Sequence, residues 1–241
     1  MQNNPQRGKQ EDKAKRFVEV FCGAYASGKS ENALNRAIHF ARKGEKITLV
    51  DIDSVEPAYC LRPIIPRLEA QGVDIIAQRD YFGLGEAGGV VTGEQVNCLS
   101  RGGNIIIDVG YGASGLDTLD ILSGIKDEPN LKIYLVVNTS KFETRDVENI
   151  IEYYHFASGL NKKPWKKFSG LISNTHFGSE TTREDIICGY EILKKVAMQV
   201  EVPIIAIGAD IGLKAAMPPD GKYDGVEIWY LERHMPDAMW A

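Results

Sequence analysis

The sequence has no apolar run long enough to span a bilayer and no apolar leader-like segment near its start. Its four cysteines form no CxxC pair, and its four histidines lack HxxH and HExxH spacing, which argues against a local metal or redox motif. Basic residues are not in excess, because 28 Lys and Arg stand against 33 Asp and Glu, for a net charge of -5. We therefore expect a cytoplasmic protein with no membrane or nucleic-acid partner.

The composition suits one large α/β domain, since 44% of the 241 residues are hydrophobic and 25% are charged. From Phe17 onward, short apolar runs alternate with longer amphipathic ones, which is typical of a parallel sheet with connecting helices. We expect residues 1–16 to form a disordered tail, residues 17–241 a single domain, and residues 83–93 a mobile loop. The predicted strands are 17–22, 47–50, 73–77, 104–108, 133–137, 168–174, 203–207 and 226–230, and the predicted helices follow Gly28 and cover about 144–155 and 182–199.

The segment between the first predicted strand and helix fits the pattern G-x-x-x-x-G-K-[ST], in the context that this pattern requires. Its glycines let backbone N–H groups converge on phosphate oxygens at a helix N-terminus. Lys29 would reach the β- and γ-phosphates of a nucleotide, and Ser30 would offer its hydroxyl to Mg²⁺. The sequence thus predicts a three-layer P-loop NTPase fold, with a mostly parallel sheet of seven to eight strands and helices on both faces. The nucleotide-binding residues predicted here are Gly23, Ala24, Tyr25, Ala26, Ser27, Gly28, Lys29, Ser30 and Glu31.

Acidic residues follow two other predicted strands and are candidates to hold the metal ion and to orient an attacking water. Asp108 ends the apolar strand Asn104–Asp108, as a Walker B acid does, and the N–H of Gly110 could meet the γ-phosphate. Asp51 and Asp53 end the second strand, and we expect them to point in opposite directions. On that expectation, only one of the two acids faces the nucleotide.

The order of these motifs resembles the MinD/ParA branch of P-loop ATPases, which also includes the nitrogenase iron protein and the CobQ/CobB-like enzymes. The resemblance covers residues 17 to about 207, and ends with an asparagine late in the sheet. Residues 51–57 and 174–178 are similar to an uncharacterised bacterial group of ATP-binding proteins within that branch.

This resemblance implies roles for individual residues. It implies that Asp53 orients the hydrolytic water, that Asp108 is the switch acid and that Asn174 reads adenine, so the expected ligands are ATP and ADP with Mg²⁺. Residues near 207–210, Ala209 among them, would line the other side of the base. The implied catalytic residues are Lys29, Asp53 and Asp108, and the residues implied to act on the metal are Ser30, Asp53 and Asp108.

The chain departs from the branch at its phosphate loop. The signature lysine of the branch falls on Ala24, and Tyr25 and Ala26 replace its glycine pair. Because that lysine reaches the partner's phosphates across a nucleotide-sandwich dimer, the sequence is compatible with a monomer as well as a homodimer. The C-terminal amphipathic membrane helix of the MinD type is not evident either.

Two functions of different classes remain open from the sequence. In the first, which we favour, the chain is an ATPase that acts as a nucleotide-driven switch on a partner protein. In the second, it is a small-molecule kinase or amide-ligase-type enzyme that transfers phosphate to a carboxylate. GTP is disfavoured as the nucleotide, because residues 138–141 lack the aspartate of the guanine-reading N/T-K-x-D motif.

Overall fold

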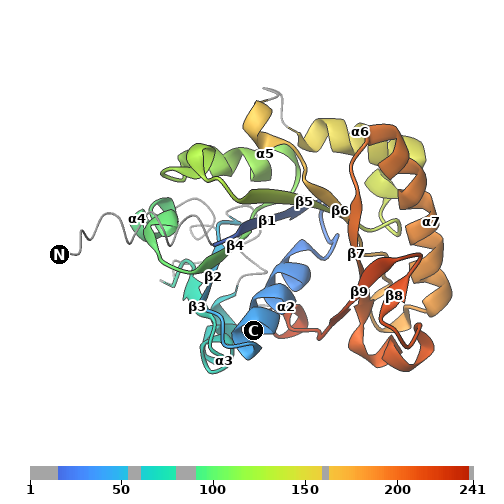
Figure 1. Ribbon diagram of the computed structural model, residues 1–241, viewed down its shortest axis with the longest axis horizontal. Coiled ribbons are helices and arrows are strands. Elements are labelled where there is room, and N and C mark those ends of the chain that lie inside the picture. The colour runs from blue at the N-terminus through green and yellow to red at the C-terminus, as the bar shows by residue number, and fades with distance from the viewer. Residues whose placement is uncertain (1–15, 54–60, 80–90, 159–162, 239–241) are drawn as a thin grey trace, which may run out of the picture.

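The computed structural model describes residues 16–53, 61–79, 91–158 and 163–238. Nine strands within them form one sheet in the order β3-β2-β4-β1-β5-β6-β7-β9-β8 (Figure 1). All neighbouring strands run parallel except β8 and β9, which are antiparallel. The strands are β1 Val18–Gly23, β2 Ile47–Asp51, β3 Asp74–Ile76, β4 Asn104–Asp108, β5 Leu131–Val137, β6 Gly170–Ser173, β7 Ile204–Asp210, β8 Lys222–Tyr223 and β9 Val226–Leu231.

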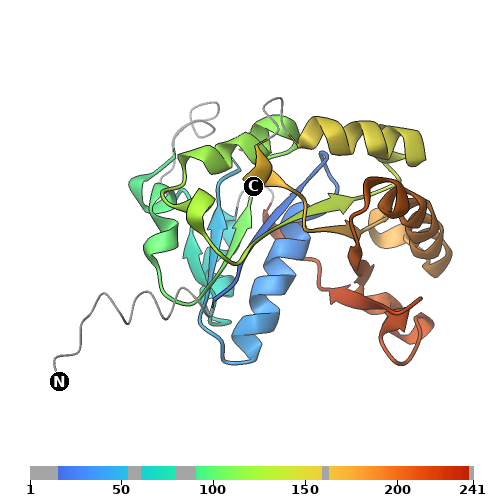
Figure 2. The same cartoon turned by 45° about the horizontal axis from the view of Figure 1, so that its top comes forward.

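Helices cover both faces of this sheet, so the expected α/β fold class is confirmed. Figure 1 shows α5 and α6 on one side of the strands and α2 on the other, and Figure 2 shows the same layers with the top turned forward. The helices of at least four residues outside 3₁₀ turns are α2 Lys29–Arg42, α3 Ile65–Glu69, α4 Gly93–Val96, α5 Gly112–Asp117, α6 Val147–Ala157 and α7 Arg183–Val200.

The two faces of β1 bury two different cores. Val20 packs in the cluster that contains Ile150 of α6, whereas Phe21 packs in the cluster that contains Leu34 of α2. Successive residues of a strand alternate between faces, so a strand covered on both sides needs apolar residues at nearly every position. All six residues of β1 are buried, as this argument requires. The central strand is therefore fixed from both sides at the point where the phosphate loop leaves it.

The sheet has one strand more than the seven to eight predicted. β8 is a two-residue strand that pairs with β9 across a tight turn at Asp224 and Gly225, whose φ angles are 51° and 79°. An Asp-Gly pair with two positive φ angles is the favoured turn of a two-residue hairpin. The sequence therefore carries a signal for β8, and the prediction missed it.

Two predicted segments fall wholly or partly outside the described residues. Residues 1–15 of the expected tail are among them, and so is most of the expected loop at 83–93, whose last residue, Gly93, begins α4. Arg16, which was assigned to the tail, is 4% exposed and forms an ion pair with Glu128. Arg16 is thus packed against the domain.

No helix in the described ranges has the length and apolar character needed to cross a membrane.

Candidate functional site

The loop after β1 has the backbone geometry of an anion-binding turn. Ala26 and Gly28 have φ angles of 52° and 86°, in the left-handed region, and α2 begins at Lys29. Left-handed residues in such a turn curve the chain so that successive N–H groups face one concavity, next to the positive end of the helix dipole. A β-carbon on Gly28 would lie 2.1 Å from Asn174 Nδ2, so both space and φ require glycine there.

Two asparagines hold this loop from outside. Asn138, which follows β5, donates from Nδ2 to the carbonyl oxygen of Ala26 at 3.3 Å. Asn174, which follows β6, donates from Nδ2 to the carbonyl oxygen of Ser27 at 2.7 Å. These two bonds fix the carbonyl groups of Ala26 and Ser27, and the Ser27 N–H donates to the carbonyl oxygen of Ala24 at 3.1 Å, so the shape of the loop is set by the protein itself. The sequence singled out Asn174 for adenine and missed Asn138, although a buried asparagine after an apolar strand is a detectable signal.

Lys29 and three carboxylates meet beside the loop. Lys29 Nζ lies 3.0 Å from Asp53 Oδ2 in an ion pair whose side chains are 10% and 7% exposed. Asp51 and Asp108 are aligned in register at the ends of the neighbouring strands β2 and β4. Asp51 Oδ1 accepts a hydrogen bond of 3.0 Å from the Asp53 N–H, which fixes the turn between these two acids. One buried cation therefore faces three acidic side chains.

The excess of acidic side chains and their burial shift the pKa values of Asp108, Asp51 and Lys29. Burial raises the pKa of Asp108 above its usual value, and repulsion from Asp51 and Asp53 adds to this rise, although Lys29 opposes it. Burial also raises the pKa of Asp51. For Lys29, burial alone would lower the pKa, but attraction to Asp108 and Asp53 outweighs burial and raises it. The site thus keeps its lysine charged and is short of positive charge.

The expectation that Asp51 and Asp53 point in opposite directions is wrong. Both acids interact electrostatically with Lys29 and with Asp108. Residues two apart in an extended chain lie on the same side, because the side-chain period of a strand is two. The alternation argument therefore does not choose between these acids, and the ion pair of Asp53 with Lys29 is what distinguishes it.

The residues expected near Mg²⁺ have the chemistry that this ion needs. The Ser30 hydroxyl acts against the rise in the pKa of Asp108, and Asp108 Oδ1 is buried with no hydrogen-bond partner among the described residues. No group of three or more His, Cys, Asp or Glu side chains in the described ranges is arranged to hold a metal by itself. Mg²⁺ in phosphate-loop sites takes one or two protein oxygens and completes its shell with water and phosphate oxygens. The arrangement of Ser30 and Asp108 fits that mode of binding.

A pocket of about 700 Å³ opens over the loop. Three of its sides come from the phosphate loop, the loop after β6 and the end of β7, and Asp53 lines it beside Lys29. The structure thus brings Asn174 and Ala209, both predicted to surround a base, into one cavity with the loop, while Asp108 lies beneath it, 3% exposed. Its lining residues beyond the loop include Asp53, Lys141, Asn174, His176, Phe177, Ala209, Leu231, Arg233, Met235 and Pro236.

The side chain of Glu31 has a different use from the one expected. Its two carboxylate oxygens accept the backbone N–H groups of His234 and Met235, at 2.7 and 3.0 Å. Burial raises the pKa of Glu31, and these two donors partly offset that rise. Glu31 lines the pocket, but its carboxylate holds the C-terminal segment rather than pointing to a ligand.

Comparison with known proteins rests on structure, since no protein-family model and no curated protein matches this sequence. FtsY from Thermotoga maritima has 16% sequence identity and a TM-score of 0.55, with 95% of this chain and 73% of that chain covered. The nucleotide-binding protein in complex with ADP from Archaeoglobus fulgidus has 16% identity and a TM-score of 0.50, with 85% and 88% covered. The fold is that of the P-loop NTPases. The signal recognition particle receptor FtsY from Elizabethkingia anophelis, at 19% identity and a TM-score of 0.51, is longer, and this chain spans 63% of it, with 82% of this chain covered.

Proposed function

We propose that this P-loop NTPase binds ATP with Mg²⁺ and hydrolyses it, as a nucleotide-driven switch of the MinD/ParA type that acts on a partner protein. The observation that carries the proposal is the ion pair of Lys29 with Asp53 beside a glycine-containing loop that lines a pocket at the start of α2. A nucleotide bound together with Mg²⁺ would suit this site, because its phosphates would give Lys29 a new partner and the metal ion would supply the positive charge that the three acids lack.

Each residue near the loop has a distinct part in hydrolysis. Lys29 binds the β- and γ-phosphates, and Ser30 with Asp108 holds Mg²⁺, which when bound neutralises charge that develops on the phosphate oxygens. Asp53, released from Lys29 by the phosphates, accepts a hydrogen bond from the attacking water and orients it. The N–H of Gly110, two residues after Asp108, stabilises the γ-phosphate. These steps need no residue from a second chain.

Base preference follows from the orientation of the Asn174 amide. Its Nδ2 is engaged by the Ser27 carbonyl at 2.7 Å, so Oδ1 is the atom that remains to contact a base. A carbonyl oxygen accepts from the amino group of adenine, whereas guanine presents a carbonyl oxygen at the equivalent position. The protein should therefore prefer ATP to GTP.

A binding titration tests this proposal. Labelled ATP and GTP are titrated with Mg²⁺ into the wild type, Lys29→Ala and the matched control Lys43→Ala, whose lysine is exposed at the other end of α2. We expect Lys29→Ala to weaken ATP binding by at least about tenfold, since charge-assisted contacts contribute about 1.5–3 kcal/mol. Unchanged affinity in Lys29→Ala would exclude the loop as a phosphate site, and equal or tighter GTP binding would exclude adenine recognition.

The switch role is tested separately from hydrolysis. A switch retains its partner in one nucleotide state, so affinity for a purified partner should differ between ATP and ADP. The rival kinase or ligase function predicts instead that phosphate from labelled ATP appears on a small carboxylate compound. Transfer of that kind, with no water-dependent release of phosphate, would replace the switch by the enzyme.

A further inference from the structure

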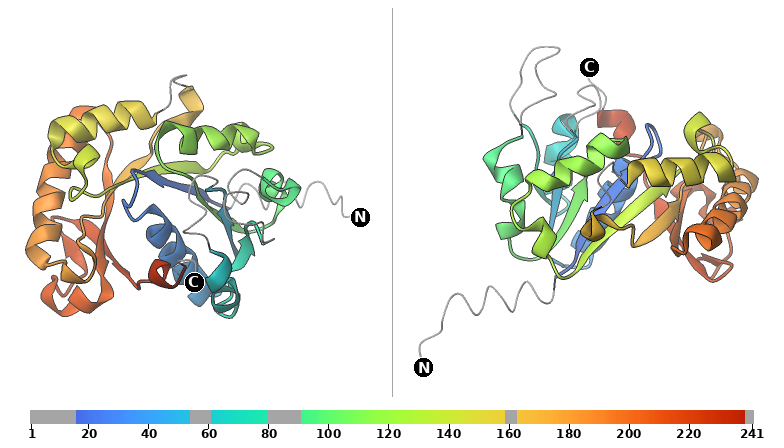
Figure 3. Two further views of the ribbon diagram at one scale, coloured as in Figure 1. Left: turned by 180° about the vertical axis from the view of Figure 1, so that it is seen from behind. Right: turned by 90° about the horizontal axis from the view of Figure 1, so that it is seen from above.

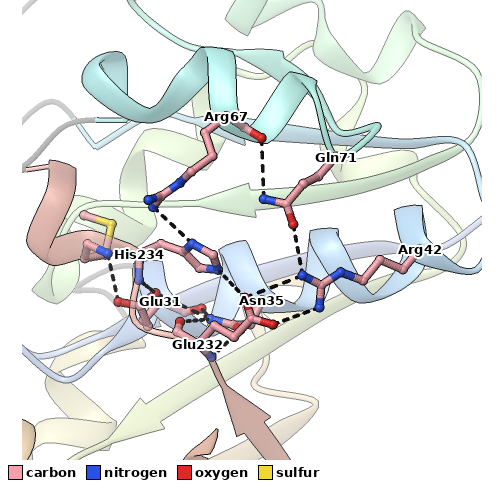
Figure 4. Close-up of polar contacts among 8 residues, drawn as sticks. Glu31, Asn35, Arg42, Arg67, Gln71, Glu232 and His234 are labelled. Atoms are coloured by element: carbon pink, nitrogen blue, oxygen red, sulfur yellow. Dashed lines mark hydrogen bonds and ion pairs between the residues drawn. The ribbon is translucent and has the colours of Figure 1, made fainter.

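The segment that follows β9, residues 231–236, runs back along the helix of the phosphate loop, and we call it the C-terminal strap. Figure 3 shows this end of the chain beside α2 when the molecule is seen from behind. Glu31 accepts the two N–H groups of His234 and Met235, and Asn35 and Glu232 exchange two hydrogen bonds of 2.8 Å (Figure 4). The strap is thus tied to two successive turns of α2.

Arginines on either side add to this attachment. Arg42, at the end of α2, forms an ion pair of 2.9 Å with Glu232. Arg67 of α3 contacts Nδ1 of His234 at 3.2 Å (Figure 4). His234 is 5% exposed, so the middle of the strap is buried between these two helices. These hydrogen bonds and ion pairs, together with the burial of His234, indicate that the strap is held in a fixed position against α2 and α3.

The other side of the strap forms part of the pocket wall. Leu231, Arg233, Met235 and Pro236 line the pocket together with the phosphate loop. Arg233 is exposed and extends towards the loop after β6, where its Nη2 lies 3.8 Å from the position of a β-carbon on Gly178. No hydrogen-bond or ion-pair partner of Arg233 is found among the described residues, whereas Arg42 of α2 and Arg67 of α3 both contact the strap.

We propose that the C-terminal strap is the wall of the nucleoside half of the pocket and that Arg233 contacts the base or ribose of the bound nucleotide. This inference rests on the proposed nucleotide function. The phosphates occupy the loop end of the pocket, so the strap end lies beside the nucleoside. A guanidinium stacks on aromatic rings and donates to sugar oxygens, which makes an unpaired arginine at this position a suitable contact.

Glu31 connects the part of the site proposed for the phosphates to the part proposed for the nucleoside. Glu31 directly follows Ser30, so one turn of α2 carries both the hydroxyl assigned to Mg²⁺ and the carboxylate that holds the strap. Loss of this carboxylate should loosen the nucleoside contact and leave the phosphate-binding N–H groups in place. Glu31 is therefore a positioning residue, and its effect passes through the strap.

The experiment compares ATP with tripolyphosphate, which has the phosphates but no nucleoside. Both are titrated by calorimetry with Mg²⁺ into the full chain as wild type, Arg233→Ala, Glu31→Gln and the control Arg79→Ala, an exposed arginine after β3 at the opposite edge of the sheet. We expect Arg233→Ala to bind ATP about tenfold more weakly and tripolyphosphate unchanged, from the usual strength of a cation–π contact. Glu31→Gln should shift ATP in the same direction by less, because the amide keeps one acceptor oxygen.

The outcomes separate this inference from the proposed function. Wild-type ATP affinity in Arg233→Ala would overturn the inference, and so would equal losses of ATP and tripolyphosphate, which would make Arg233 a phosphate ligand. Failure of the wild type to bind either compound would instead overturn the nucleotide function itself. Because Arg233 is exposed, its truncation leaves the fold intact and the result interpretable.

Discussion

At the scale of single residues, Asp51 and Asp53 differ in their partners rather than in their position. Asp53 pairs with Lys29, while Asp51 accepts the Asp53 N–H and lies in register with Asp108. The first is therefore placed to exchange its partner when phosphates arrive, and the second is committed to the turn. If the proposed hydrolysis is right, this difference makes Asp53 the acid that orients water and Asp51 the acid that supports the turn.

The assignment predicts different kinetics for two matched substitutions. Asp53→Asn keeps the shape of the side chain, so ATP should still bind, while kcat falls by about 10²-fold or more because a contact to the attacking water acts mainly in the transition state. Asp51→Asn retains an oxygen for the Asp53 N–H and should lower kcat by less. Single-turnover hydrolysis and a binding titration on both variants measure this. The reverse ranking would show that Asp51 is the catalytic acid.

The buried carboxylate of Asp108 should lower the stability of the ligand-free protein, although the proposed metal site needs its charge. Its carboxylate is 3% exposed with one oxygen unpartnered, and burial raises its pKa, so the ionised form destabilises the ligand-free fold. Asp108→Asn should therefore stabilise the ligand-free protein by about 1 kcal/mol, or roughly 2–4 °C in Tm. A folded pKa above the unfolded one means that this gain is larger at about pH 8 than at about pH 5.

Thermal unfolding with and without Mg²⁺ and ATP checks this conflict. The rise in Tm that ligand binding gives the wild type should shrink in Asp108→Asn, since a residue that holds the metal has lost its charge. A lower Tm for the ligand-free variant would mean that the ionised carboxylate contributes a stabilising contact. An unchanged ligand effect would remove Asp108 from the metal site.

At the scale of elements, local signals predicted more than contacts between distant parts of the chain. The bounds of β4 agree with the prediction, and α7 begins at Arg183, one residue after the predicted start, with Thr182 as its N-cap, whose side chain accepts the Asp185 N–H. Both features depend on neighbouring residues, as helix caps and buried strands do. The bond of Asn138 to the phosphate loop and that of Glu31 to the strap join residues more than a hundred positions apart. No periodicity or spacing in one sequence encodes such pairings.

The connection between α6 and β6 contains a buried lysine that the sequence did not single out. Lys166 is 2% exposed, and its Nζ contacts Asp117 at 2.6 Å and Asp120 at 2.8 Å. These bonds hold the turn before β6 against the end of α5. Three further lysines, Lys162, Lys163 and Lys167, lie within four residues of Lys166 in the sequence, and nothing in that pattern distinguishes the buried one.

Lys166→Met should therefore destabilise the protein, by about 1–3 kcal/mol, since two partly exposed carboxylates lose a charged donor. Equilibrium unfolding in urea measures the change. Lys167→Met is the matched control, because Lys167 is adjacent and exposed, and it should change the unfolding free energy by less than about 0.5 kcal/mol. Equal effects of the two substitutions would show that the buried contacts of Lys166 add nothing to stability.

At the scale of the whole molecule, the face around the phosphate loop differs from that of a trans-activated dimer. Ala24, at the position of the signature lysine, is 2% exposed and packs in the core next to β1. Tyr25 is 51% exposed, and its ring meets that of Tyr111 edge-on with centroids 6.1 Å apart. The loop thus presents an aromatic pair from its own chain, and no basic side chain at residue 24 extends from it.

ATP hydrolysis should accordingly not require the protein to form a dimer. Because Lys29, Asp53 and Asp108 come from one chain, the rate of ATP hydrolysis per molecule should stay constant as protein concentration rises. Steady-state phosphate release is measured over a wide range of concentrations while light scattering reports the mass in ATP. Dimer formation without a change in specific activity agrees with this expectation. Activity that appears only together with an ATP-dependent dimer would mean that another group crosses the interface, and Tyr25→Ala would then test whether the aromatic pair forms that contact.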